Sequence, residues 1–388
     1  MTTRNSSKAS ASWCASPKPD SDQVQYRRDR IHPCRHRTGF QPRTGHNSAN
    51  PVAVTTTSRT PMPRINLTEF DIYGILDADT PEAHAFTTYL AYWDCLERSI
   101  LEIYGDDPHT ALLAELQSRK AYNKLKSRPF RGNDELLRSL LLNGWNSEQN
   151  LYLVDEDDPR VSAQTQWINV YAYYSSGKTA LAWILTQQGA APNSHRNLLR
   201  ALVAQANSAL IPAPWQFSCT TIDPTPAYHG FATDPAPVSN LAADAPCQDM
   251  AAKMLKTTRR KRIDDLIAEE KTRTGRKRAK AGTKKLIDTR TEATTIFDFM
   301  YRSRARANYG DPSMFYMGHL NEHRSRNYLT AVKNVTSTTM FLFEALIAQR
   351  APDTLVNTAI HWMTRDRSGI SDQVLKPRLQ TLGLIAET

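Results

Sequence analysis

The segment 301–311 carries the residue types best suited to binding a phosphate. Its sequence is Tyr-Arg-Ser-Arg-Ala-Arg-Ala-Asn-Tyr-Gly-Asp, with three arginines at alternate positions before an Asn-Tyr pair. On a helix, residues four apart are neighbours, so Arg302 would lie beside Arg306 and Arg304 beside Asn308. Guanidinium groups match the oxygens of a phosphate in geometry and charge, so the pattern predicts a phosphate site. Pairing of these arginines with carboxylates elsewhere in the chain is the alternative.

Two basic segments are a second feature typical of polyanion binding. Residues 253–285 contain 14 Lys/Arg against 4 Asp/Glu, and residues 1–65 contain 11 against 3. The whole chain has a formal net charge of +10, so the remainder is mildly acidic. Such dense basic stretches bind phosphates without sequence specificity, or they stay solvated. The candidate nucleic-acid contacts are Arg259, Arg260, Lys261, Arg262, Arg276, Lys277 and Arg278, together with Arg302 and Arg306 of the first segment.

Several familiar catalytic signatures are absent from the sequence. The string Ser-Ser-Gly-Lys-Thr at 175–179 lacks the earlier glycine of a phosphate-binding loop, because position 172 is alanine. No GxSxG or HExxH motif occurs, and no cysteine has the context of a nucleophile. The histidines and cysteines are not spaced as metal ligands. We therefore expect neither a metal nor any other cofactor.

Residues 66–160 are interpreted as an N-terminal helical region. Thr80-Pro81 is typical of a helix start, and large side chains then recur three or four residues apart from Phe86 to Tyr104. The string Gly-Asp-Asp-Pro at 105–108 is typical of a helix end. Two further helices are expected before residue 160.

Helices are also expected in 164–210 and in 291–350. The first carries its large residues on one face, and these are Trp167, Val170, Tyr171, Tyr174, Leu181, Ile184 and Leu185. The clearest apolar stripe runs from Tyr328 to Leu346 at steps of 4, 3, 4, 3 and 4, which is typical of the seam of a bundle helix. Residues 351–388 predict one more helix and a tail. No alternating strands or βαβ rhythm occurs, so the fold class is all-α.

Two segments depart from this helical pattern. Residues 1–65 are rich in Ser, Thr, Pro, Arg and Asn, which predicts a disordered basic arm. Residues 211–290 predict an insert that is extended and Pro-rich at first and then forms two basic helices around Gly275. No apolar run reaches the roughly 18 residues of a membrane helix, and five scattered cysteines fit free thiols in a reducing cytoplasm.

Two blocks of the sequence together resemble the HEPN superfamily of small helical bundles. The first block consists of Tyr173-Tyr174, Lys178-Thr179-Ala180-Leu181, the string Gly-Ala-Ala-Pro-Asn-Ser-His at 189–195, and Leu198-Leu199. The second consists of the Arg-rich segment 302–311 and the final helix 328–346. The resemblance covers 162–210 and 291–350. It implies a HEPN-like bundle at 161–350, interrupted by the insert at about 211–290.

The resemblance also implies an RNA-handling function. The family includes metal-independent RNases, often toxins of toxin–antitoxin pairs or phage-defence effectors, with a site commonly formed across a dimer. Their Arg and His stabilise phosphate charge and transfer protons while a ribose 2′-OH attacks. Here Tyr309 stands where the family has the histidine that follows the arginine. The catalytic set implied is Arg304, Asn308 and Tyr309, with His195 as the proton carrier.

Three functional hypotheses remain open at this point. The first is a non-catalytic cytoplasmic module that binds RNA or a protein partner, in stress or phage defence, with a homodimer formed through the bundle. The second is a metal-independent endoribonuclease that uses the Arg/Asn/Tyr cluster. The third is a DNA-associated protein that binds through its basic segments alone, without a recognisable helix-turn-helix.

Overall fold

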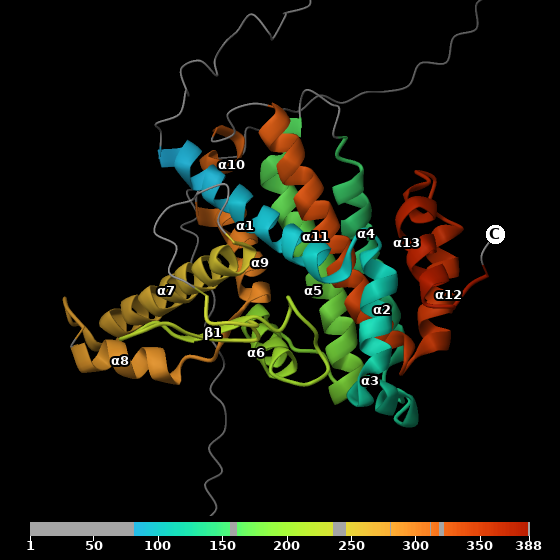
Figure 1. The fold of residues 1–388 in the computed structure, drawn as a ribbon, viewed down its shortest axis with the longest axis horizontal. Helices are drawn as coiled ribbons and strands as arrows, with labels where there is room; N and C mark the ends of the chain where they lie inside the picture. Colours follow the sequence, from blue (N-terminus) through green and yellow to red (C-terminus); the bar gives the residue numbers. More distant parts are fainter. Residues whose placement is uncertain are drawn as a thin grey trace, which may run out of the picture. The chain divides into compact units, whose positions relative to one another are not determined.

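Helices α5 (Val161–Gln188) and α11 (Glu322–Ala348) lie side by side at the centre of the protein (Figure 1). The computed structural model describes residues 81–155, 161–235, 246–279, 281–310, 312–317 and 322–386. From Tyr328 to Ile347 α11 is buried on almost every side, because most of its residues are apolar or small and its buried Glu344 is paired with Arg378. The hydroxyls of Thr338 and Thr339 each donate a hydrogen bond to the backbone carbonyl oxygen four residues earlier. The stripe predicted for this helix is thus confirmed as core.

The other helices surround this central pair. α4 (Asp134–Tyr152) packs along α5, and α1 (Pro81–Tyr104) crosses α11 (Figure 1). α12 (Pro352–Met363) and α13 (Ile370–Thr381) lie against α4. Shorter connections are α2 (Pro108–Ser118), α3 (Lys120–Asn123) and the 3₁₀ turn η2 (Lys124–Ser127). The described helices before residue 155 therefore share one core with the later ones, and the all-α class is confirmed.

Local sequence signals explain where these helices begin and end. Asp107 caps α2 by accepting a hydrogen bond from the Thr110 N–H, with proline at the first helical position. Ser194 caps α6 (His195–Ala206) in the same way, through the Asn197 N–H. Gly105 has a φ of +72° just after α1, a backbone conformation that glycine adopts without strain.

The expected insert is more ordered than the sequence indicated. It contains α7 (Cys247–Thr274) and α8 (Ala281–Arg290), which are the two predicted basic helices. Gly275, with a φ of +66°, ends α7 as predicted. The Pro-rich part forms strands β1 (Ser218–Thr221) and β2 (Ala227–His229), which join β3 (Thr294–Thr295) in an antiparallel sheet of order β2-β1-β3. The sheet was not predicted, because its strands are too short to show alternation.

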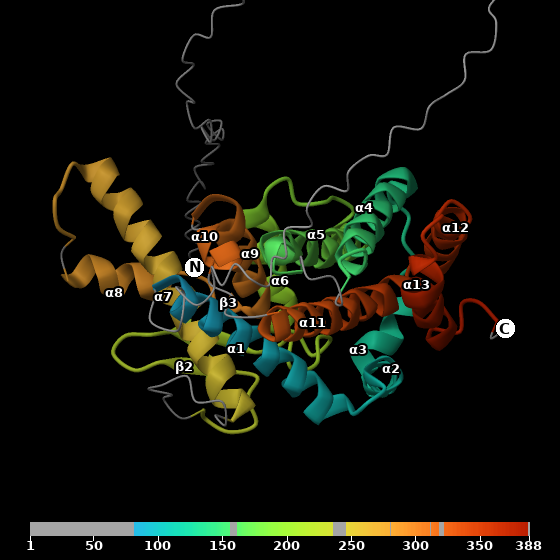
Figure 2. The ribbon, with the colours of Figure 1, turned by 90° about the horizontal axis from the view of Figure 1, so that it is seen from above.

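α7 and α8 lie on the side of the bundle opposite α12 and α13 (Figure 2). α7 packs against α1, against β1 and against α9 (Ile296–Ala305). Among the residues that the structure describes, none of the helices combines the length and apolar composition of a membrane span. The predicted arm at 1–65 lies outside the described residues.

Candidate nucleic-acid interface

The Arg-rich segment forms the end of α9 and one turn of π-helix, η3 (Arg306–Gly310). α9 begins at a capping box, in which one oxygen of the Asp298 carboxylate accepts hydrogen bonds from the Thr295 N–H and from the Thr295 hydroxyl. Single turns of π-helix within or at the end of an α-helix are frequent at functional sites. Asp311 of the predicted segment lies outside the described residues.

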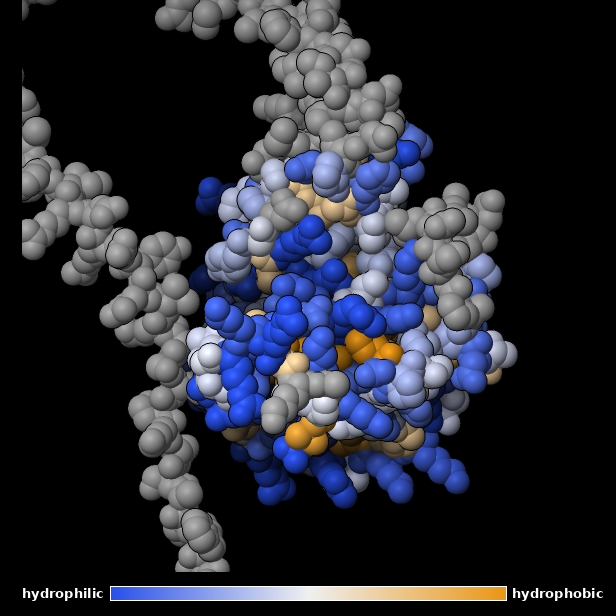
Figure 3. Space-filling view, turned by 90° about the vertical axis from the view of Figure 1, so that its left-hand side faces the viewer, coloured by the Kyte–Doolittle hydropathy of each residue, from blue (hydrophilic) through white to orange (hydrophobic). Residues whose placement is uncertain are grey.

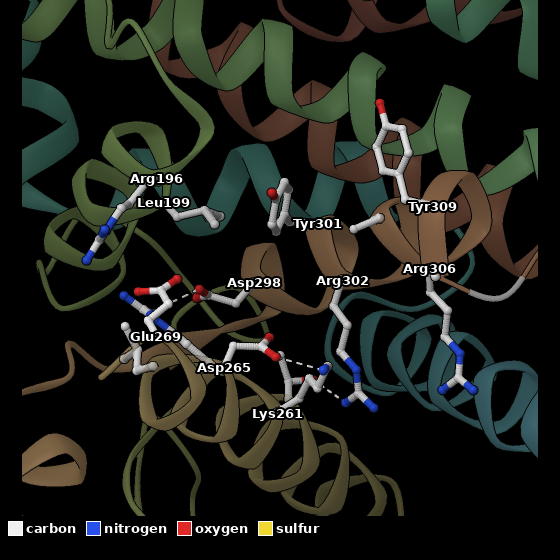
Figure 4. Close-up of a pocket in the computed structure, with 15 residues that line it drawn as sticks. Arg196, Leu199, Lys261, Asp265, Glu269, Asp298, Tyr301, Arg302, Arg306 and Tyr309 are labelled. Atoms are coloured by element: carbon white, nitrogen blue, oxygen red, sulfur yellow. Dashed lines mark hydrogen bonds and ion pairs between the residues drawn. The ribbon is translucent and has the colours of Figure 1, made fainter. Parts of the chain in front are cut away.

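An open cavity of about 760 Å³ lies between α6, α7, α9 and η3. Its cationic side chains are Arg196 of α6, Lys261 and Arg262 of α7, and Arg302 and Arg306. Tyr301 and Tyr309 add aromatic rings, and Asp265, Glu269 and Asp298 add three carboxylates. Arg302 and Arg306 point in the same direction from α9 and η3, which confirms the side predicted for them (Figure 4).

The carboxylates neutralise only part of this charge. Lys261 is paired with Asp265 at 2.7 Å, and Arg262 with Glu292 at 2.7 Å and Asp298 at 3.3 Å. Arg302 instead donates to the hydroxyls of Thr257 and Thr258. Within the described chain, neither Arg302 nor Arg196 has a carboxylate within 4.0 Å. These two guanidinium groups therefore remain available to an anion in the cavity.

Arg304 lies next to this cavity, inside a cage of four tyrosines. Its guanidinium carbon is 5.2–5.9 Å from the ring centroids of Tyr173, Tyr174, Tyr301 and Tyr309. One Nη donates to the Tyr174 hydroxyl at 2.8 Å. The side chain is only 6% exposed, and no described residue accepts a hydrogen bond from its Nε or brings a carboxylate within ion-pair distance. Ring faces attract a cation but do not neutralise it, so the site retains affinity for an anion.

His195, the first residue of α6, contacts the same cage. Its Nδ1 lies 2.7 Å from the Tyr173 hydroxyl, and its ring packs on Tyr301. Burial, and then the charges of Arg304 and Lys178, lower the pKa of His195, so the imidazole is neutral at pH 7. Burial raises the pKa of Tyr173, so its phenol stays protonated. A neutral imidazole beside a buried guanidinium could accept a proton from a hydroxyl held at Arg304.

The structure thus brings together three of the four residues predicted for catalysis, namely Arg304, His195 and Tyr309. Asn308 is half-buried, and its side chain makes no hydrogen bond to any described residue. Sequence reasoning did not assign Tyr173, Tyr174, Tyr301, Arg196 or Lys178 to the site. The paired tyrosines were visible as part of the family resemblance, but nothing local indicates that they surround an arginine from another helix.

One predicted nucleic-acid contact requires correction. Arg259 is fully buried, pairs with Asp288 at 2.8 Å, and donates to four carbonyl oxygens around the sheet. Those four carbonyls belong to Cys219, Asp288, Thr291 and Glu292. The guanidinium N–H groups of Arg259 are all used in hydrogen bonds within the protein, so none is left for a nucleic acid. Arg259 therefore anchors α7 and is removed from the set of candidate contacts.

The other predicted basic residues are accessible. Arg260 is exposed on α7, and Arg276, Lys277 and Arg278 are exposed in the turn between α7 and α8. Figure 3 views the protein from the side on which α7 and α8 lie, and shows hydrophilic side chains around a smaller hydrophobic patch. No group of three or more His, Cys, Asp or Glu side chains within the described ranges is placed to hold a metal ion.

Comparisons of the chain with protein-family models, with curated proteins and with solved structures found no match.

Proposed function

We propose that this protein binds RNA through the cavity between α6, α7 and α9. The observation that supports the proposal is the convergence of five cationic side chains and two tyrosines on one open cavity, beside the buried Arg304. Arginines and lysines contact phosphates, and exposed aromatic rings stack on bases. The family resemblance favours RNA over DNA. The free thiols of Cys95, Cys219 and Cys247 support a reducing compartment such as the cytoplasm.

Replacing Arg302 and Arg306 together by glutamine tests this binding. Charge-assisted hydrogen bonds contribute about 1.5–3 kcal/mol each, so we expect the affinity for an RNA oligonucleotide to fall by tenfold or more. The salt dependence of log K should also become shallower by about 0.7 for each phosphate of a single strand that the variant no longer neutralises. Fluorescence anisotropy with labelled RNA and with DNA of the same sequence, at several salt concentrations, measures both quantities.

The matched control is Arg131→Gln with Arg138→Gln. Both residues are exposed, one just before α4 and one on α4, away from the cavity, and the double variant changes the net charge equally. If the control weakens binding as much as the cavity variant, the protein attracts RNA only through its overall charge. Equal affinity for DNA and RNA would favour the DNA-associated alternative.

A metal-independent endoribonuclease is a second candidate, favoured by the contact between His195 and Tyr173 beside Arg304. In this mechanism the neutral His195 accepts the proton of a ribose 2′-OH as its oxygen attacks the adjacent phosphorus. Arg304 stabilises the extra negative charge on the phosphate oxygens. The bond between phosphorus and the 5′-oxygen breaks, the 5′-oxygen takes up a proton from water, and a 2′,3′-cyclic phosphate remains.

The endoribonuclease predicts a specific pH profile in EDTA. Because the pKa of His195 is lowered below 6.5, the base form is already present at pH 7. Cleavage should therefore rise with pH through a midpoint below 6.5 and then level off, and His195→Gln should reduce the rate by about 10²–10⁴-fold. Gel assays of total and transfer RNA give the rates. Cleavage that survives His195→Gln would exclude this site, and its absence in the folded wild type would leave the non-catalytic proposal alone.

A further inference from the structure

One face of α5 leaves aromatic side chains partly open to solvent. Trp167 is 49% exposed, and Tyr171 and Tyr174 are half-buried. These residues and Lys178 follow one another at steps of 4, 3 and 4, so they form a single row along the helix. The Trp167 and Tyr171 rings are stacked, with centroids 6.5 Å apart. We call this row the aromatic stripe.

The aromatic stripe is continuous with the Arg304 cage. Tyr174 belongs to both, because its hydroxyl accepts the hydrogen bond from Arg304. Tyr309, which is 75% exposed, covers Arg304 from η3. Its side chain points to the opposite side of η3 from Arg306 (Figure 4). A ligand on the stripe would therefore meet the buried guanidinium before it reached the arginines of the cavity.

We propose that the aromatic stripe is a stacking track for the unpaired bases of single-stranded RNA, with a phosphate of the same strand at Arg304. The inference rests on the proposed function and narrows its substrate class. Stacking on aromatic rings tolerates any base, since every base has a π-face, whereas a duplex has its faces covered. Another flat ring that covers the exposed part of Trp167 and of the two tyrosines would bury further apolar area and stack favourably.

Charge complementarity favours this occupant over an apolar protein surface. The stripe ends at Lys178, and its Tyr174 contacts Arg304, so two cations lie at the end of the stripe where a phosphate of the strand would bind. The large exposed aliphatic side chains of the described chain belong to segments other than α5, and they are Leu101, Ile103, Leu136, Leu153, Leu286 and Ile360. A helix or sheet docking on α5 would need such side chains around the rings, where a nucleic acid needs cations.

The test compares Trp167→Ala, Trp167→Phe and Ile360→Ala in the full chain. A labelled uridine 12-mer and a duplex of equal length serve as probes in fluorescence anisotropy. We expect Trp167→Ala to weaken binding of the single strand on the order of tenfold, while Trp167→Phe, which keeps a ring, retains most of the affinity. Ile360 is 45% exposed on α12, so Ile360→Ala is the matched control, in which an exposed apolar side chain is lost from a helix other than α5. Duplex binding should change little in any variant.

The outcomes separate this inference from the proposed function. Unchanged single-strand affinity in Trp167→Ala, with loss in the Arg302/Arg306 variant, would overturn the track and leave RNA binding in place. Absence of RNA binding by the wild type would overturn both. If Trp167→Ala instead abolishes self-association in sedimentation velocity and leaves RNA binding intact, the stripe is a contact between copies of the chain, and the track is again overturned.

Discussion

Replacing Arg259 by alanine is expected to lower the free energy of unfolding by about 3–5 kcal/mol, because the change leaves a buried carboxylate without its partner. The Asp288 side chain is 3% exposed, and the Arg259 side chain has no exposure at all. Four backbone carbonyls would lose their hydrogen-bond donor at the same time. Urea unfolding followed by circular dichroism measures the change.

Arg260→Ala is the matched control for this effect. It removes the same side chain from the next position of α7, where the arginine is exposed, so we expect a change within about 0.5 kcal/mol. Similar losses in the two variants would contradict the anchoring role of Arg259. Arg259→Ala should also weaken RNA binding without any direct contact, since α7 carries Lys261 and Arg262 into the cavity.

The stability difference between wild type and Arg259→Ala should depend on pH. Burial opposes ionisation of Asp288, but the Ile222 N–H, the Thr221 hydroxyl and Arg259 together lower its pKa below 3.8. A carboxyl whose pKa is lowered by folding contributes stability above its unfolded pKa and loses it as the pH falls through the folded value. The wild type should therefore keep this contribution in full at pH 7 and lose it only below about pH 4. In Arg259→Ala, burial without the guanidinium disfavours the ionised Asp288, so its carboxyl should take up a proton at a higher pH, and the difference between the two proteins should shrink as the pH falls from 7.

Arg378→Ala is the second substitution with a large expected effect, again about 3–5 kcal/mol of unfolding free energy. Arg378 of α13 is fully buried, pairs with Glu344 at 2.9 Å, and binds both oxygens of Glu148. Burial alone lowers the pKa of Arg378, but the charges of the two glutamates outweigh it and raise the pKa above its usual value. Without Arg378, two carboxylates would remain buried side by side.

Arg367→Ala, an exposed arginine that precedes α13, is the control, with little expected change. Trp145 donates its indole N–H to Glu344 at 2.8 Å, so loss of Arg378 should also alter the near-ultraviolet circular dichroism of the core. Because α12 and α13 lie across the bundle from α7 and α8, the variant should bind RNA normally while folded. Loss of RNA binding in folded protein at low temperature would contradict this separation.

The sequence predicted the parts of the fold that depend on neighbouring residues. Helix stops such as Gly105 and Gly275 act within one helical turn, and both lie where the sequence indicated. The apolar row from Tyr328 to Leu346 likewise identified α11 as a core helix. The row from Trp167 to Leu185 identified a helix face, but not that Trp167 at its start is half exposed while Leu185 at its end is fully buried.

The candidate site shows the same division. The sequence alone determined the all-α class and the placement of Arg302, Arg304 and Arg306 on one short helical segment, because both follow from local periodicity. Only the tertiary structure decided that Arg304 meets tyrosines of α5, and that His195 joins them from α6. Arg259 and Arg260 are identical and adjacent, yet one is an anchor and the other a surface charge. Their difference arises from which face of α7 docks on the sheet, and the docking depends on burial against segments distant in the chain.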